Sequence, residues 1–309
     1  MELIVRKYGG TSVDSIDKIK KIALKTKNDI QNNNKILLVV SAMGKSTDDL
    51  LDQAKQISNS PDRRELDLLM SSGEIISSTL MSIALQEIGV KAKSLTGFQA
   101  GIHTNSRFGQ AEIQSINNSR IMNEIQNNNT LVIAGFQGFS DEQDVTTLGR
   151  GGSDTTAVAL AVALKADTCE IYTDVSGVYT ADPRLCNKAR PLTQIGYEEM
   201  LEMATTGAKV IHSRAVEVAA INHMPLIVKN TFELLQKGTI IQSESNMENI
   251  NKVRGIAHQS QIGKITIKGV PDKPGIASSV FQPLAEAMAA RLGRTPLILQ
   301  KLVQEPEVL

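Results

Sequence analysis

The stretch Thr147-Leu148-Gly149-Arg150-Gly151-Gly152-Ser153-Asp154 leads into an almost entirely apolar segment at residues 157–164, which predicts a buried helix. Three glycines within four positions let the backbone come close to a ligand, because no Cβ stands in the way. We expect Ser153 or Asp154 to cap the helix, whose first N–H groups favour a phosphate or a carboxylate. Arg150 can bind a carboxylate through two parallel hydrogen bonds. A glycine-rich turn with a helix cap explains the same residues without a ligand, so the rest of the chain has to decide.

Apolar runs alternate with helical patterns along most of the chain, which is typical of a parallel sheet covered by helices on both faces. The pattern predicts strands at residues 2–5, 35–40, 90–95, 131–134, 168–172, 225–228 and 238–241. It predicts helices at residues 13–23, 66–88, 157–164, 197–205 and 214–221. Such sheets bind ligands at the carboxyl ends of their strands, so the loops at residues 7–12, 41–47 and 149–154 are expected at one rim.

Composition excludes several classes of function. The 309 residues include 33 Lys+Arg and 33 Asp+Glu, and this zero net charge gives no general attraction to nucleic acid or to an anionic membrane. The two cysteines have no metal-ligand spacing and suit a reducing compartment, and the four histidines are scattered, so no protein-bound metal cluster is expected. The start of the chain lacks a signal-peptide pattern, and no apolar run approaches a membrane span, so we expect a cytoplasmic protein.

Charged residues near the predicted rim suggest a chemistry. Lys7 follows the first strand, where it either enters the rim or is an ordinary solvated lysine. Glu74 lies inside a largely apolar helical stretch, where it faces either solvent or the pocket, as a ligand for a cation. An arginine and a glutamate in one pocket suit a zwitterion, with its carboxylate on Arg150 and its ammonium on Glu74. Together with several helix N-termini, this favours phosphoryl transfer to an amino acid.

Five motifs resemble, in the same order, those of the amino-acid kinase family, and most closely those of the aspartokinases within it. They are Lys7-Tyr8-Gly9-Gly10-Thr11-Ser12-Val13, Ser41-Ala42-Met43-Gly44, Ser72-Gly73-Glu74, Gly149-Arg150-Gly151-Gly152-Ser153-Asp154 and the loop from Asp174 to Arg184. Tyr8 stands where phenylalanine is common in the family. The resemblance implies a three-layer αβα sandwich on a mostly parallel sheet. It also implies ATP- and Mg²⁺-dependent phosphorylation of the side-chain carboxylate of L-aspartate, the first step towards lysine, threonine and methionine.

The resemblance also implies a role for individual residues. Lys7 would neutralise charge on the transferred phosphoryl group, and Asp154 would orient that lysine. The residues implied to hold aspartate are Ser41, Thr47, Glu74, Arg150 and Ser153. The residues implied to hold the nucleotide are Lys7, Gly9, Gly10, Ser12, Thr173, Asp174, Tyr179, Arg184 and Lys209.

The catalytic domain is expected to span residues 1–245, and the composition of the chain changes after it. We predict strands at residues 253–257 and 264–270, and the turn Val270-Pro271-Asp272-Lys273-Pro274-Gly275-Ile276-Ala277 resembles the start of a small α+β ACT regulatory domain at residues 253–287. Residues 288–309 match nothing in the family, although residues 296–299 are a possible strand. We expect residues after about 287 to be disordered or irregularly packed, without an effector site, and a homodimer only if the regulatory region were complete.

Two other functions fit part of the pattern. Another kinase of the same fold, for glutamate, carbamate or a nucleoside monophosphate, would share the sandwich, but the Lys7 and Arg150 motifs and the ACT-like start argue against it. A non-catalytic regulator that binds an amino acid or a nucleotide belongs to a different class. Lys7, Glu74, Arg150 and Asp154 together favour an enzyme, because a binding protein does not need all four.

Overall fold

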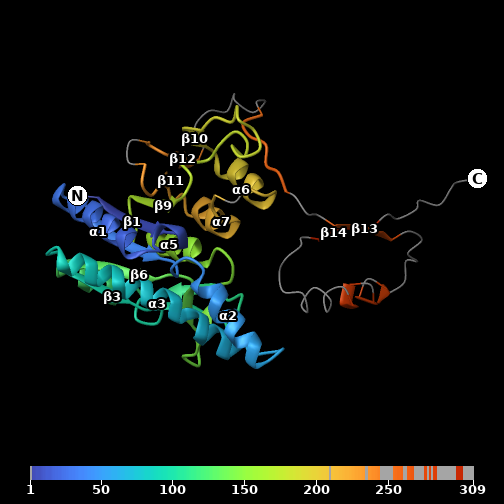
Figure 1. The fold of residues 1–309 in the computed structure, drawn as a ribbon, viewed down its shortest axis with the longest axis horizontal. Helices are drawn as coiled ribbons and strands as arrows, with labels where there is room; N and C mark the ends of the chain where they lie inside the picture. Colours follow the sequence, from blue (N-terminus) through green and yellow to red (C-terminus); the bar gives the residue numbers. More distant parts are fainter. Residues whose placement is uncertain are drawn as a thin grey trace, which may run out of the picture. The chain divides into compact units, whose positions relative to one another are not determined.

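A computed structural model describes most of the chain as two compact units, Met1–Ala257 and His258–Leu309, each treated separately below. The described residues are 2–208, 210–233, 236–243, 253–259, 263–267, 275–276, 278–279, 281–283 and 297–301. Figure 1 traces the chain from blue at the N-terminus to red at the C-terminus.

An eight-stranded sheet in the order β10-β12-β11-β9-β1-β2-β6-β3 is the centre of the first unit (Figure 1). Six strands run parallel: β1 (Leu3–Tyr8), β2 (Lys35–Val40), β3 (Ala92–Leu95), β6 (Thr130–Ala134), β9 (Thr168–Thr173) and β11 (Leu226–Asn230). β12 (Thr239–Ile241) is antiparallel to β11, and β10 (Gln194–Ile195) is parallel to β12. The predicted mostly parallel sheet is confirmed.

Helices cover both faces of this sheet, which explains the continuous apolar runs of its strands. Along β2, Leu37 and Val39 belong to one core, whereas Leu38 and Val40 belong to the other, because successive side chains point to opposite faces. On one face lie α1 (Ile16–Gln31) and α3 (Arg63–Glu87), which run side by side (Figure 1). On the other lie α4 (Ser119–Gln126), α5 (Gly152–Ala163) and α7 (Ser213–Ile221), with α6 (Tyr197–Thr205) against α7. The three-layer αβα sandwich is therefore confirmed.

A buried cluster of charges joins the central strands. Arg6 on β1 is 4% exposed, and its Nε lies 2.6 Å from Glu170 Oε2 on β9, while its second nitrogen lies 2.6 Å from Asp29 Oδ2 on α1. Lys229 Nζ on β11 lies 2.5 Å from Glu170 Oε1. Burial alone would raise the pKa of Glu170, but Arg6 and Lys229 hold it below its ordinary value. The cluster therefore ties three strands and one helix together through ionised groups.

Several elements were not predicted from the sequence. α2 (Ser46–Ile57) begins inside the segment that we predicted as a loop, and a short 3₁₀ turn covers Gly10–Ser12. A second sheet in the order β5-β4-β7-β8 consists of β4 (Ile102–Thr104), β5 (Ile113–Ile116), β7 (Gln137–Phe139) and β8 (Val145–Thr147). Strands of three or four residues are too short to show a clear alternation of apolar and polar positions.

Helix α3 corrects one expectation drawn from composition. Among the residues that the structure describes, it is the one helix with the length and apolar composition of a membrane span. The expectation that no apolar run approaches such a span is therefore wrong for this segment. Packing against α1, β3 and β6 explains part of its apolar composition, and its buried side includes Asp67 and Glu74, whereas Leu68, Ile76 and Ile83 are exposed.

The end of the chain differs from the prediction in two places. Residues 253–257 form no strand. They remain with the first unit, where Ile256 N donates to the loop residue Thr180 O at 2.8 Å and Ala257 packs against the core. In the second unit, β13 (Gly263–Ile267) pairs in parallel with β14 (Leu297–Lys301). The expectation of irregular structure after residue 287 is thus wrong for β14, which contains most of the predicted possible strand. The ACT-like turn at residues 270–274 lies outside the described residues.

We predict that Arg6→Leu lowers the free energy of unfolding by about 3–5 kcal/mol, because it leaves the buried carboxylate of Glu170 without a main partner. Urea unfolding measures this change. Arg107→Leu is the matched control, since it removes an ion pair to Glu112 whose side chains are 70% and 56% exposed, and it should cost about 0–1 kcal/mol. Equal losses in the two variants would contradict a stabilising role for the buried cluster.

Candidate active site

A pocket of about 180 Å³ lies at the carboxyl ends of β1 and β2. The seven residues predicted to act in catalysis or to hold aspartate all line it, namely Lys7, Ser41, Thr47, Glu74, Arg150, Ser153 and Asp154. Phe136, Gly149, Gly151 and Gly152 complete the lining. The structure thus brings these residues together, while their individual roles stay predictions.

Lys7 and Asp154 form an ion pair inside this pocket. The Nζ of Lys7 lies 2.6 Å from Asp154 Oδ1, and the two side chains are only 13% and 11% exposed. The other carboxylate oxygen of Asp154 accepts a hydrogen bond from the backbone N of His212 at 3.2 Å. Lys7 is therefore a pocket residue and not a solvated lysine at a strand end, which settles the alternative that the sequence left open.

The glycine-rich loop begins α5 in a way that the sequence did not predict. The helix starts at Gly152, and its N-cap is Gly151, with φ 71° and no capping side chain. The predicted cap by Ser153 or Asp154 is therefore wrong, because the helix starts early enough to place both in its first turn, where they line the pocket. A Cβ on Gly151 would lie 2.2 Å from His212 Cγ, so both the conformation and the space require glycine there.

Two charged side chains, the buried Asp67 and the half-buried Arg214, which the sequence did not single out, hold the chain just before this loop. Asp67 on α3 accepts hydrogen bonds from Thr147 N at 2.7 Å, Thr147 Oγ1 at 2.8 Å and Gly109 N at 2.9 Å. Arg214 on α7 donates to the backbone oxygen of Leu148 at 2.7 Å. The loop that presents Arg150 is thus anchored from helices on both faces of the sheet. The sequence signal for Asp67 was an acidic residue in an apolar helix. Its partner Thr147 could not be predicted from it, because Thr147 is 80 residues away.

Glu74 combines deep burial with an unsatisfied oxygen. It is 3% exposed, its Oε1 accepts a hydrogen bond from Ala42 N at 3.0 Å, and its Oε2 has no partner among the described residues. Burial raises the pKa of the Glu74 carboxyl to about 7. A buried carboxylate that lacks partners costs free energy unless a ligand supplies them, and an ammonium group does so well. Glu74 therefore faces the pocket and not solvent.

Phe136 is a lining residue that sequence analysis missed. Its φ of 68° lies in the left-handed region, which is uncommon for a bulky side chain. Two hydrogen bonds hold it there: Phe136 N donates to Thr156 Oγ1 at 3.1 Å, and Leu148 N donates to Phe136 O at 2.9 Å. We found no local sequence signal for this conformation, because both partners come from other elements.

The predicted nucleotide residues lie in two neighbouring loops. Gly9 N, in the loop after β1, donates to Tyr172 O at the end of β9 at 3.2 Å. A Cβ on Gly10 would lie 2.9 Å from Ala42 O, so glycine allows the loops after β1 and β2 to touch. Thr173 and Asp174 follow at the end of β9, where Thr173 Oγ1 donates to Asp174 Oδ1 at 3.0 Å.

Farther along the second loop, Tyr179 bridges to Pro191, and the exposed Arg184 pairs with Asp182 through two nitrogens, at 3.0 and 2.8 Å. None of Thr173, Asp174, Tyr179 and Arg184 is part of the lining of the 180 Å³ pocket. The structure therefore places them in a separate region at the same end of the sheet. Lys209 lies outside the described residues.

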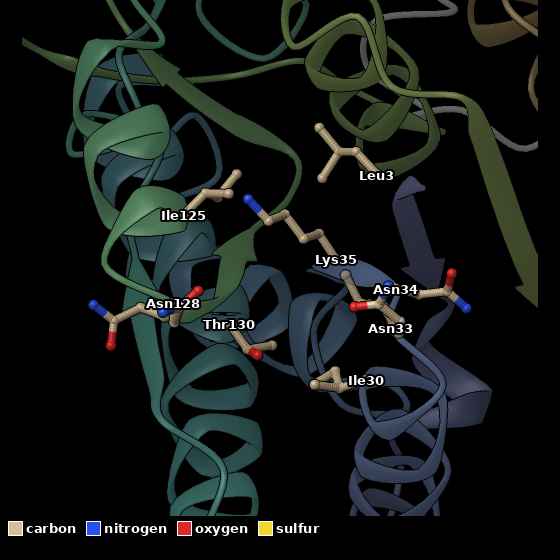
Figure 2. A pocket seen from close by; sticks show the side chains of 10 residues that line it. Leu3, Ile30, Asn33, Asn34, Lys35, Ile125, Asn128 and Thr130 are labelled. Atoms are coloured by element: carbon tan, nitrogen blue, oxygen red, sulfur yellow. The ribbon is translucent and has the colours of Figure 1, made fainter. Parts of the chain in front are cut away.

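A second pocket of about 130 Å³ lies at the opposite ends of the strands. Figure 2 shows Leu3, Lys35 and Thr130 around it, which begin β1, β2 and β6. Asn33 and Asn128, with φ of 68° and 57°, end the turns after α1 and α4 in the left-handed conformation. These asparagines are explained by helix termination, and the pocket lies away from the charged rim, so we do not place the active site there.

Comparisons with known proteins agree with this geometry. The model of the amino acid kinase family matches residues 2–230. The aspartokinase of Geobacillus stearothermophilus is 48% identical over 285 residues, which cover 92% of this chain and 70% of that protein. The crystal structure of aspartate kinase from Synechocystis is similar with a TM-score of 0.71 and 42% identity, over 93% of this chain and 48% of that one. E. coli aspartokinase III in complex with aspartate and ADP gives a TM-score of 0.72 and 28% identity, over 80% of this chain and 66% of that one.

The raised pKa of Glu74 predicts a pH-dependent cost to stability. Below the ordinary value of 4.5 the carboxyl is protonated in both states, and between 4.5 and about 7 the folded state retains a proton that the unfolded state releases. The free energy of unfolding therefore falls as the pH rises from 4.5 to about 7, and this loss is complete above pH 7. Glu74→Gln should raise the free energy of unfolding by about 2–3 kcal/mol at pH 8 and by much less at pH 5.

Denaturant unfolding at the two pH values tests this expectation. Glu87→Gln, on the exposed end of the same helix, is the control and should change stability by about 0.5 kcal/mol or less at both. A Glu74→Gln variant whose effect is the same at pH 5 and pH 8 would show that this carboxyl titrates at its ordinary value.

Proposed function

This chain belongs to the amino-acid kinase family and, within it, to the aspartokinases, and we propose that it transfers the γ-phosphoryl group of ATP to the side-chain carboxylate of L-aspartate. The products are 4-phospho-L-aspartate and ADP. The observation that supports this most strongly is one pocket that holds the Lys7–Asp154 pair, the unsatisfied carboxylate of Glu74 and the guanidinium of Arg150.

These residues are opposite in sign to the charges of aspartate and lie in one pocket, which supports the proposal. Glu74 Oε2 is an unpaired acceptor, which suits the ammonium group of an amino acid, and Arg150 offers a planar pair of donors to its α-carboxylate. The hydroxyls of Ser41, Thr47 and Ser153 supply further donors around the same space. We propose that this arrangement directs the side-chain carboxylate of the substrate towards Lys7.

The transfer itself needs positioning and charge neutralisation. An oxygen of the aspartate side chain forms a bond to the γ-phosphorus while the bond from that phosphorus to the β–γ bridging oxygen breaks, and ADP leaves with the bonding electrons. The attacking carboxylate is ionised at neutral pH, so no general base has to remove a proton from it. Lys7 stabilises the charge on the transferred group, and Asp154 orients Lys7.

We propose that the nucleotide lies along the loops after β1 and β9. Gly9 and Gly10 allow close approach of its phosphates, and Thr173, Asp174, Tyr179, Arg184 and Lys209 hold the remainder. Magnesium, bound to the phosphates, would neutralise part of their charge. A phosphate-bound Mg²⁺ needs only one or two protein carboxylates, and those of Asp154, beside Lys7, and of Asp174, after β9, would be the ones to hold it. A homodimer and a cytoplasmic location stay predictions.

Trapping of the acyl phosphate with hydroxylamine tests the reaction. Aspartate and ATP together should give hydroxamate, whereas glutamate and carbamate should not, and a regulator that only binds would give none with any substrate. Lys7→Ala should lower kcat by roughly 10²–10³-fold with little change in aspartate affinity, because it removes a charge that acts in the transition state. Lys93→Ala, which removes a lysine whose side chain is 51% exposed, is the control.

Arg150 is exposed in the structure, and we propose that the α-carboxylate covers it on binding. Arg150→Ala should therefore weaken aspartate binding by about 2–5 kcal/mol, because the charge pair that binding removes from water would be lost. Arg150→Lys should recover only part of the loss, because a lysine cannot offer two parallel hydrogen bonds. Titration calorimetry with aspartate measures both, and ADP affinity in the same variants is the internal control. Unchanged aspartate affinity in Arg150→Ala would remove this residue from the substrate site.

A further inference from the structure

A chain of hydrogen bonds connects the two loops proposed to hold the nucleotide. Thr231 directly follows β11 and is 4% exposed, and Ser12, in the glycine loop after β1, is 2% exposed. Thr231 Oγ1 lies 3.0 Å from the backbone oxygen of Thr173, at the end of β9, and 2.6 Å from Ser12 Oγ. Thr231 therefore contacts both loops through a single buried atom.

The direction of these bonds follows from the number of hydrogens. A hydroxyl has one hydrogen, and the carbonyl oxygen of Thr173 can only accept, so Thr231 donates its hydrogen there. The Ser12 hydroxyl must then donate to Thr231 Oγ1. The backbone N of Ser12 already donates to Gly9 O at 2.9 Å. Both donors of Ser12 are thus used within the protein, and none is left for a phosphate.

Neighbouring contacts strengthen the same connection. Thr231 N also donates to Thr173 O at 3.0 Å, and Asn230 Nδ2 donates to Asp174 O at 3.2 Å. Ser176 Oγ donates to Glu233 Oε2 at 2.7 Å. The start of the loop after β9 is therefore bonded at several points to the residues that follow β11, and Thr231 extends this set of bonds to the glycine loop.

We propose that Thr231 is a positioning residue for the nucleotide, which acts by holding the glycine loop and the loop after β9 at a fixed separation. Ser12 acts through Thr231, in place of the direct nucleotide contact that the family resemblance implies. The inference rests on the proposed function, because it assumes that these two loops bind the nucleotide. When the two loops are already fixed in the free protein, they lose less conformational entropy as the nucleotide binds.

The test compares Thr231→Val, Ser12→Ala and the double variant with Thr26→Val. Thr26 is a matched control, because it is fully buried and its hydroxyl donates to Ile22 O at 2.8 Å on α1. Titration calorimetry should show ADP affinity about three- to tenfold weaker in Thr231→Val and unchanged in Thr26→Val. The KM for ATP should rise by a similar factor, whereas the KM for aspartate should not.

Two further results separate positioning from other roles. The double variant should bind ADP no more weakly than Thr231→Val alone, because both substitutions break the same chain. Thr231→Ser keeps the hydroxyl and should retain ADP affinity within about twofold. If the Thr231→Val protein does not fold, Thr231→Ala takes its place in all comparisons.

Three outcomes would overturn the proposal. A loss of ADP affinity in Ser12→Ala that is absent in Thr231→Val would make Ser12 a direct ligand. Additive losses in the double variant would show two independent roles, and a Thr231→Val variant that binds ADP like Thr26→Val would leave Thr231 a structural residue only. If the unmodified chain forms no hydroxamate from aspartate and ATP, the proposed function fails, whereas the ADP titrations still decide the role of Thr231.

Discussion

The buried pairing of Arg6 with Glu170 constrains the fold, because it joins two central strands at matching positions of the parallel register. A slip of one residue between β1 and β9 would turn every side chain of one strand to the other face of the sheet. The buried charges make such a slip expensive, since they would lose their partners. The register in turn sends the next residue, Lys7, to the opposite face, where it meets Asp154 on α5. Adjacent cations on one strand thus join strands on one face and line the pocket on the other.

Helix α3 carries two buried carboxyl groups whose surroundings differ. Asp67 and Glu74 are seven residues apart, about two helical turns, so both lie on the inward side of the helix. Asp67 accepts three hydrogen bonds and anchors the loop before Arg150, whereas Glu74 accepts one and leaves Oε2 without a described partner. Burial raises the pKa of both groups, but only at Glu74 is the missing stabilisation available to a ligand. The same kind of residue on one helix is therefore fully engaged within the protein at Asp67, whereas at Glu74 it leaves one oxygen for the proposed ligand.

Sequence analysis predicted the layers and most of the pocket because both depend on local patterns. The strand at residues 35–40 and the helix at residues 197–205 have the predicted bounds, and the five motifs supplied every charged residue of the pocket. The predictions failed where partners are distant in sequence or elements are short. The second sheet has strands of three or four residues, and the partners of Phe136 and Asp67 are on other elements. The cap of α5 was predicted wrongly because Gly151 adopts a conformation that its neighbours do not reveal.

The loop that carries Arg150 and the loops proposed to hold the nucleotide are held by residues from different parts of the fold. The loop that carries Arg150 is held by Asp67 and Arg214, from α3 and α7, whereas the loops after β1 and β9 are held together at Thr231, after β11. The pair Lys7–Asp154 connects the halves, because its lysine comes from β1 and its aspartate from the helix that follows the Arg150 loop. Under the proposed function, a change in the support of one loop should alter the binding of one substrate, whereas a change in this pair should alter the transfer between them. The two substrates would then bind through separately supported loops and still meet at a single fixed charge.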